Sequence, residues 1–280
     1  MKKAVISIVL IVFVLGAVFS LTGCSLSQSS GPTVDQCWAD RETLAYSVYD
    51  SNKGGAKVGN ATMSIITSRF FTEEEKEAHA GADTKMTSVV TVGSQTTSTE
   101  FYGKIYRTVS LKKEYVNADA PEQNYVLNAR HEDKNYVYEL TYPNAPEKNK
   151  TGKLNVGSTG YTDNEFLYYY IRCYDLSSTT PSSIKVADPF TDTVVTLNTL
   201  VRTTMDTVAT EAPAIGSVMC YYVNVCRSET PVGDVIIADF LPKTKEFTYG
   251  EGTIIKSSGF PTKIVENNLQ YVLNGFSVME

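Results

Sequence analysis

The chain has 280 residues, and its 31 acidic against 25 basic residues give a formal net charge of −6. An acidic surface repels nucleic acid and anionic lipid headgroups, so neither is an expected partner. Its 18 tyrosines, together with many Val, Thr and Ile, are typical of strands rather than helices.

The first residues have the order of an export signal that ends at a lipid-attachment cysteine. Lys2 and Lys3 precede an apolar stretch over residues 4–19, as in a secretory signal. Leu21-Thr22-Gly23-Cys24 then supplies the Leu, two small residues and Cys at which lipoprotein signals are cut. The sequence therefore predicts that residues 1–23 are a signal peptide and that Cys24 is lipidated. Such a protein would be held by acyl chains on the extracytoplasmic face of a bacterial membrane. The alternative is an uncleaved spanning helix, which needs roughly 20 apolar residues.

The remainder of the chain is expected to form a tether and one domain. Residues 24–34 are mostly Ser, Gln, Gly and other polar residues, which predicts a flexible tether. Residues 35–280 are expected to form a single large β-rich domain, since all-β folds often reach this length undivided. The stretch 143–160, rich in Pro, Asn, Lys and Gly, could divide that domain into two halves.

Four further cysteines lie in a compartment that permits disulfides. Cys220 and Cys226 fall on one predicted strand at a separation of about 20 Å, too far to bond to each other. Each could pair with Cys37 or Cys173, or all four could be buried thiols.

Alternating apolar residues predict a sheet along the chain. Residues 41–51 and 56–70 are expected to form a hairpin, with a β-bulge at Gly59 where the apolar parity changes. Thr72 and Glu75 have the spacing of a capping box, so residues 72–80 form either two helical turns or a solvated loop. Further strands are expected at 85–92, 99–114, 124–131, 135–142, 183–186, 193–208, 215–228, 233–240, 246–256, 262–266 and 270–276.

One principal helix is predicted at residues 164–172. Asp163 can cap it, and its apolar residues recur at spacings of three and four. The residues expected to face the sheet are Phe166, Leu167, Tyr170 and Ile171. Tyr168 and Tyr169 are expected on the opposite side.

Three groups of residues resemble an uncharacterised family of bacterial exported proteins, the domain-of-unknown-function 3108 family. The groups are Glu42, Leu44, Tyr46 and Val48 with Gly59 and Ala61; residues 166–172, an aromatic helix ending in Arg; and Pro261, Lys263 and Ile264. The family often has Trp where this chain has Tyr49. The resemblance implies a mainly β fold in which a strongly curved antiparallel sheet, similar to the half-barrels that carry lipoproteins, surrounds one principal short helix. It carries over no catalytic residue.

Common catalytic signatures are missing from the sequence. There is no Gly-x-Ser-x-Gly, His-Glu-x-x-His, phosphate loop or Cys-x-x-Cys, and the two histidines, His79 and His131, are expected to be solvated. The sequence therefore predicts no catalytic residue, no metal site and no cofactor. A non-enzymatic role is favoured over an enzyme assembled from scattered carboxylates.

Aromatic residues are the remaining candidates for a site. In a curved sheet, inward-facing tyrosines can line a groove that takes an acyl chain or an apolar peptide. The candidate groove residues are Tyr102, Tyr106, Tyr168, Tyr169 and Tyr222. Alternatively they pack the core as cross-strand pairs. The leading expectation is a lipoprotein that binds a hydrophobic or lipidic ligand in the concavity of the sheet, and the second is a structural or adaptor lipoprotein that binds another envelope protein.

Overall fold

The computed structural model describes residues 38–104, 107–157, 161–163, 166–172, 182–201, 206–227, 234–240, 246–249, 253–256 and 259–279. The chain divides into two units, Met1–Gly31 and Pro32–Glu280, and all described residues belong to the second. The predicted signal peptide, Cys24, the tether and Tyr106 lie outside the described residues.

Strands make up most of the described chain, as the composition predicts. The first half contains β1 (Arg41–Asp50), β2 (Ala56–Thr67), β3 (Thr84–Val92), β4 (Gln95–Lys104), β5 (Arg107–Asn117), β6 (Tyr125–Glu132), β7 (Asn135–Thr141) and β8 (Lys150–Asn155). The second half contains β9 (Tyr161–Asp163), β10 (Ser182–Asp188), β11 (Thr193–Val201), β12 (Asp206–Ala209), β13 (Ser217–Arg227), β14 (Asp234–Phe240), β15 (Glu246–Tyr249), β16 (Thr253–Lys256), β17 (Pro261–Glu266) and β18 (Leu269–Met279). The described helices are short: α2 (Glu73–Ala78) and α3 (Leu167–Ile171).

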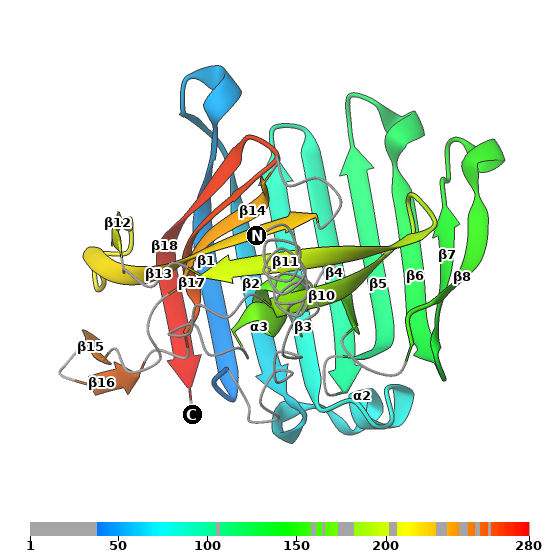
Figure 1. Ribbon diagram of the computed structural model, residues 1–280, viewed down its shortest axis with the longest axis horizontal. Helices are drawn as coiled ribbons and strands as arrows, with labels where there is room; N and C mark the ends of the chain where they lie inside the picture. Colours follow the sequence, from blue (N-terminus) through cyan, green and yellow to red (C-terminus); the bar gives the residue numbers. More distant parts are fainter. Residues whose placement is uncertain are drawn as a thin grey trace, which may run out of the picture. The chain divides into compact units, whose positions relative to one another are not determined.

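One sheet of 16 strands carries the fold. Its order is β8-β7-β6-β5-β4-β3-β2-β1-β18-β17-β14-β13-β11-β10-β9, with β12 paired to β13, while β15 and β16 pair separately. The chain thus runs outward from β1 to β8, and its last strand returns beside its first (Figure 1). The pairing of β1 with β18 joins the two halves of the sheet. Only the short pair β9–β10 is parallel among the described pairs.

The sheet curls until its second half crosses the face of its first. In Figure 1, β10 and β11 run across the N-terminal strands. At the far end of this hairpin the Tyr138 hydroxyl donates to Asp192 Oδ1 at 2.6 Å, and Lys150 Nζ donates to the Phe190 carbonyl at 2.7 Å. Side chains therefore connect β7 and β8 to the β10–β11 turn, although the described strands leave the sheet open between β8 and β9. The predicted fold class, a curved antiparallel sheet with a short helix, is confirmed.

Successive side chains of a strand point to opposite faces of the sheet. Those that point to the inside of this curl form the core. On β1 the residues Leu44, Tyr46 and Val48 are buried, whereas Thr43 is exposed. The bulge predicted on β2 is confirmed by a register shift opposite Val48 and Tyr49. A Cβ on Gly59 would lie 1.8 Å from the Thr91 carbonyl oxygen, so the close approach of β3 requires glycine there.

Helix α3 lies within the core rather than on its surface, and this corrects one sequence prediction. Phe166, Leu167, Tyr170 and Ile171 are buried as expected, but Tyr169 is buried as well, with 2% exposure. Only Tyr168 is half-buried. The reason is that the helix is covered on more than one side, with Trp38 edge-on to the rings of Phe166 and Tyr169 at 5.6 and 6.3 Å.

Some predicted strand boundaries were also wrong. The stretch 99–114, predicted as one strand, forms β4 and β5, which pair with each other. Residues 193–208 and 246–256 likewise each contain two strands, and the predicted connection 143–160 contains β8. Apolar alternation continues through 99–114, 193–208 and 246–256 without a strong turn dipeptide, so periodicity alone does not reveal the reversals in those three segments.

Candidate functional site

A partly open cavity of about 180 Å³ lies between α3 and the concave face of the sheet, and most of its lining residues are half-buried. Its floor comes from β2 to β5: Met63, Met86, Ser88, Val90, Thr97 and Lys113. The opposite wall comes from α3, β17 and β18: Tyr168, Tyr169, Glu266 and Tyr271. The side chains that meet around the cavity therefore come from both ends of the chain.

The floor of the cavity is unusually polar for a core-facing surface. Strand register aligns one row of residues across the concave face: Leu44, Met63, Ser88, Thr99, Lys113, Leu127 and Leu140. Ser88, Thr99 and Lys113 interrupt this apolar row on three neighbouring strands. We call these three residues the polar stripe.

Thr99 is the most deeply buried member of the polar stripe, with 4% exposure. Its hydroxyl is buried and has no hydrogen-bond partner among the described residues. It lies in register between Ser88 and Lys113, both of which line the cavity. An unsatisfied buried hydroxyl costs about 1–3 kcal/mol, so buried polar groups are normally paired. Of the polar stripe, Ser88 and Lys113 line the cavity, whereas Thr99 is buried between them and is not part of the lining.

The opposite wall contributes a carboxylate and aromatic rings. The Tyr168 hydroxyl donates to Glu266 Oε2 at 2.9 Å, which links α3 to β17. Tyr169 is deeply buried, and burial followed by the nearby Glu42 carboxylate raises the pKa of its phenol. The described wall thus places one ammonium group, on Lys113, and one carboxylate, on Glu266, around the same small space.

A buried ion pair fixes the end of α3 next to this cavity. Arg172 donates through Nη1 and Nη2 to the two carboxylate oxygens of Glu42, at 2.7 and 2.8 Å, and both side chains are fully buried. The Arg172 Cζ lies 5.4 Å from the centre of the Tyr169 ring. Burial, followed by Tyr169 and Glu42, raises the pKa of neighbouring Tyr46, whose hydroxyl donates to the Pro261 carbonyl. The pair therefore ties α3 to the first strand.

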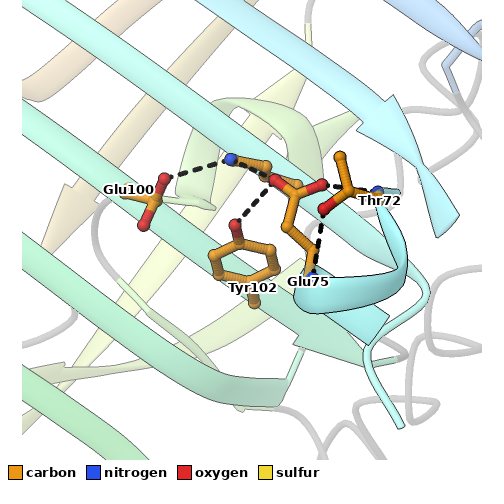
Figure 2. Close-up of polar contacts among 5 residues, drawn as sticks. Thr72, Glu75, Glu100 and Tyr102 are labelled. Atoms are coloured by element: carbon orange, nitrogen blue, oxygen red, sulfur yellow. Dashed lines mark hydrogen bonds and ion pairs between the residues drawn. The ribbon is translucent and has the colours of Figure 1, made fainter. Parts of the chain in front are cut away.

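A second polar cluster lies on the other face of the sheet, beneath α2 (Figure 2). Lys85 Nζ lies 2.7 Å from Glu75 Oε1 and 3.1 Å from Glu100 Oε2, and the Tyr102 hydroxyl donates to Glu75 Oε1 at 3.1 Å. Thr72 and Glu75 form the predicted capping box, which confirms the helical alternative for this segment. The hydrogen bond from Lys85 lowers the pKa of Glu75 to about 2. This cluster attaches α2 to β3 and β4.

The predicted groove tyrosines separate into different places. Tyr168 and Tyr169 line the cavity. Tyr102 does not, because strand alternation points Phe101 into the core and its neighbour Tyr102 to the α2 side. Tyr222 is half-buried on β13 and is not part of the cavity wall.

The polar residues of the cavity are the part of the site that sequence reasoning missed. Lys113 and Thr99 share the strand parity of Leu111 and Phe101, so they were recognisable as polar residues on core-facing positions. Glu42 gives the same signal on β1, since it alternates with Leu44 and Tyr46. A polar residue at an apolar position of the alternation is the signal that could have found them.

The histidines are less solvated than expected. His79 is half-buried, and its ring stacks on Tyr102 with ring centroids 3.5 Å apart. His131 is also half-buried, and burial, followed by the charge of Arg107, lowers its pKa. In the described part of the chain, His, Cys, Asp and Glu side chains form no group of three that could hold a metal ion. No helix in the same residues is long and apolar enough to cross a membrane.

Comparison with known proteins supports the fold. The chain is similar to the crystal structure of a β-barrel-like protein of the domain of unknown function DUF1849 from Brucella abortus, with a TM-score of 0.50. The sequences are 10% identical, and the match covers 87% of this chain and 99% of the other. At this identity the likeness shows a shared β-barrel-like fold and nothing of activity. No family model and no curated protein sequence matches the chain.

Proposed function

We propose that this protein is a lipid-anchored, extracytoplasmic binding protein without enzymatic activity, and that its ligand occupies the cavity between α3 and the sheet. The observation that carries the proposal is the mixed lining of the cavity, in which Ser88, Thr97 and Lys113 lie among apolar residues of the concave face. A ligand with polar and apolar parts would fit such a lining. The cavity is the place where the curved sheet leaves room for one.

The size of the cavity limits the ligand. An apolar cavity of about 150 Å³ accepts benzene, whereas pockets for drug-sized ligands span roughly 300–1,000 Å³. At about 180 Å³, this cavity fits a small amphipathic molecule rather than a full acyl chain. The ligand that we propose is therefore smaller than the lipidic ligand that the aromatic residues alone suggest.

Two sequence features support the cellular address in this proposal. Leu21-Thr22-Gly23-Cys24 has the residue types of a lipoprotein cleavage site. The resemblance to the domain-of-unknown-function 3108 family points in the same direction, because that family is exported. Two of its matching groups, the one containing Glu42 and the helix that ends in Arg172, meet in the buried ion pair. A paired contact between separate groups is what a shared fold would produce.

The proposal is tested by filling the cavity. Ser88→Phe adds a ring on the cavity floor, whereas Ser98→Phe adds the same ring on the opposite face, since Ser98 pairs with Val89. Full-length protein would be purified from membranes without delipidation and analysed by native mass spectrometry. We expect wild type and Ser98→Phe to retain a small molecule and Ser88→Phe to lose it, with all three folded by thermal melt. Absence of any small molecule from the wild type would reject the proposal.

An adaptor role is the second candidate, and the burial of α3 favours it. Phe166, Leu167 and Ile171 are each at most 1% exposed, so the helix fills much of the concavity that a carrier would keep open. An adaptor would retain no small molecule in the experiment above. It would instead give a specific protein crosslink in intact cells that Ser88→Phe leaves unchanged.

A further inference from the structure

We infer that the cavity takes up the apolar end of an amphipathic ligand, a short alkyl group or a group of similar size, and that the polar part of the ligand stays at the mouth. This inference rests on the proposed function, because it states which part of the ligand enters the same cavity and in which direction. It follows from the way in which burial and polarity change along the cavity wall.

The floor of the cavity has a closed end and an open end. Three core-facing residues on β3, β4 and β5 form one row of the strand register and are all buried: Met86, Phe101 and Leu111. Further along the same strands, a second core-facing row is half-buried throughout: Val90, Thr97 and Tyr115. Side chains of both rows point to the concave side, because they share strand parity. The concavity therefore closes towards Met86 and opens towards Val90 and Thr97, and these three residues line the cavity.

Burial also divides the lining residues by polarity. The buried group has no charged side chain: Met63, Met86, Tyr169 and Tyr271. The half-buried group contains the charged side chains of the lining: Ser88, Val90, Thr97, Lys113, Tyr168 and Glu266. Burying a polar group without a partner is unfavourable, whereas burying an apolar group is favourable. Thioether side chains also adapt to the shape of an alkyl group. An amphipathic ligand is therefore expected to enter with its apolar end first.

The volume of the cavity sets the length of the part that enters. Since a cavity of about 150 Å³ holds the six carbons of benzene, one of about 180 Å³ holds roughly six or seven. Up to that length, each CH₂ group moved from water into the inner end should strengthen binding about fourfold. Any further CH₂ group would lie outside the mouth and add little. The ligand class is thus an amphiphile with a short apolar end, and the cavity does not limit the size of its head group.

A series of alkyl chains tests this length. Titration calorimetry on the full chain would use n-alkyl β-D-glucosides from butyl to decyl, with the same titrations into Ser88→Phe as background. Hexyl glucoside has about three times as many heavy atoms as the benzene that a 150 Å³ cavity holds, so its sugar must stay outside. We expect the affinity to rise about fourfold per CH₂ group to hexyl or heptyl and then to level off. An affinity that keeps rising to decyl would overturn the inference in favour of a site for full acyl chains.

A pair of alcohols with the same carbon chain tests the direction of entry. In 1-hexanol one end is apolar, whereas 1,6-hexanediol has a hydroxyl group at each end. We expect the diol to bind at least tenfold less tightly, because one of its hydroxyl groups would have to enter the inner end. Equal binding of the two alcohols would contradict entry by the apolar end.

Variants at the inner end should change the length limit. Met86→Ala removes three heavy atoms from the closed end and should move the limit to chains about three carbons longer. Met63→Ala should act in the same direction, and it serves if Met86→Ala fails to fold in a thermal melt. Met219→Ala is the control, because Met219 is 45% exposed on β13 and does not line the cavity. An unchanged limit in a folded variant at either inner position would overturn the inference.

Failure of this inference can be distinguished from failure of the proposed function. If no glucoside and no alcohol binds, while the wild type retains a co-purified molecule that Ser88→Phe loses, the proposed function stands and entry by an apolar end is rejected. If the wild type neither retains a molecule nor binds a probe, both are rejected.

Discussion

The position of Glu42 along β1 determines that its side chain faces the core. Glu42 occupies the core side of β1 because it alternates with Leu44 and Tyr46, and a carboxylate there needs a partner. Arg172 supplies two nearly parallel hydrogen bonds, the geometry for which a guanidinium group is suited. Since the pair is fully buried, its members depend on each other far more than surface ions do.

Replacing Arg172 should therefore be costly. We expect Arg172→Met to lower the free energy of unfolding by about 3–5 kcal/mol, because it leaves the Glu42 carboxylate buried without its guanidinium. Adding Glu42→Leu should recover much of that loss, since it removes the isolated charge. Urea unfolding of both single variants and the double variant measures the coupling energy.

The exposed pair of Arg130 and Glu132 provides the control. Their side chains are 61% and 45% exposed at a distance of 2.6 Å, and exposed pairs contribute about 0–1 kcal/mol. If Arg172→Met were as mild as Arg130→Met, the buried pair would not hold α3 in place.

At the level of elements, α3 is a helix that packing creates. It has five residues, far fewer than the roughly 12–15 at which an isolated helix becomes even marginally stable. Phe166, at the N-terminal end of the helix, stacks on Phe101 of β4 at 4.7 Å and on Tyr169 of α3 at 5.6 Å. The stability of the helix therefore depends on its buried side chains.

The loss of stability on truncating each of these side chains should increase with the burial of that side chain. We expect Phe166→Ala and Tyr169→Ala each to cost about 3–5 kcal/mol, the range for removal of a large buried side chain. Tyr168→Ala should cost clearly less, because Tyr168 is only half-buried, even though the variant also loses the hydrogen bond to Glu266. Chemical denaturation of the three variants gives the order. Equal losses at Tyr168 and Tyr169 would contradict the observed orientation of α3.

Helix α2 is held by charge, so its stability should depend on pH. The pKa of Glu75 falls from an ordinary value of 4.5 to about 2 in the folded protein, mainly through Lys85. A carboxyl group with a lowered folded pKa stabilises the protein above its unfolded pKa, and this contribution disappears as the pH falls through the folded value. Wild type should thus lose stability between about pH 4.5 and pH 2 through this group.

Removing the Glu75 charge should flatten that part of the profile. We expect Glu75→Gln to be less stable than wild type above pH 5 and equal to it near pH 2, as measured by urea midpoints across this range. Glu74→Gln, on the exposed part of the same helix, should follow the wild-type profile. Parallel profiles for wild type and Glu75→Gln would show that Lys85 does not stabilise the carboxylate.

For the whole molecule, local pattern predicts the strands, whereas long-range pairing determines the site. Alternation was enough to place the first hairpin and the bulge at Gly59, because those features depend on residues close in sequence. Nothing local specifies that β18 pairs with β1, or that Glu266 reaches the same cavity as Lys113. Those contacts join residues more than a hundred positions apart, and the curl of the sheet brings them together.

The residues that sequence reasoning misplaced share one cause. Tyr102 was grouped with the cavity because it is aromatic, yet its strand neighbour Phe101 is the residue that faces the core. Thr99 and Lys113 were passed over because they are polar, although their parity is that of the core. Parity along the strand is thus a better guide to this site than residue type.

The proposed lipidation of Cys24 concerns where the whole molecule works, and it is open to a direct test. If Leu21-Thr22-Gly23-Cys24 is a lipoprotein site, Cys24→Ala removes the thiol that must be acylated before the signal is cut. We expect the variant to keep residues 1–23 and to incorporate no labelled fatty acid, as read by intact mass and by metabolic labelling with an alkyne palmitate. Cys220→Ala is the control. Because Cys220 is buried beside Thr262, this variant should leave labelling unchanged. Wild-type labelling of Cys24→Ala would mean that acylation occurs elsewhere, and the membrane anchor would then have to be assigned to another residue.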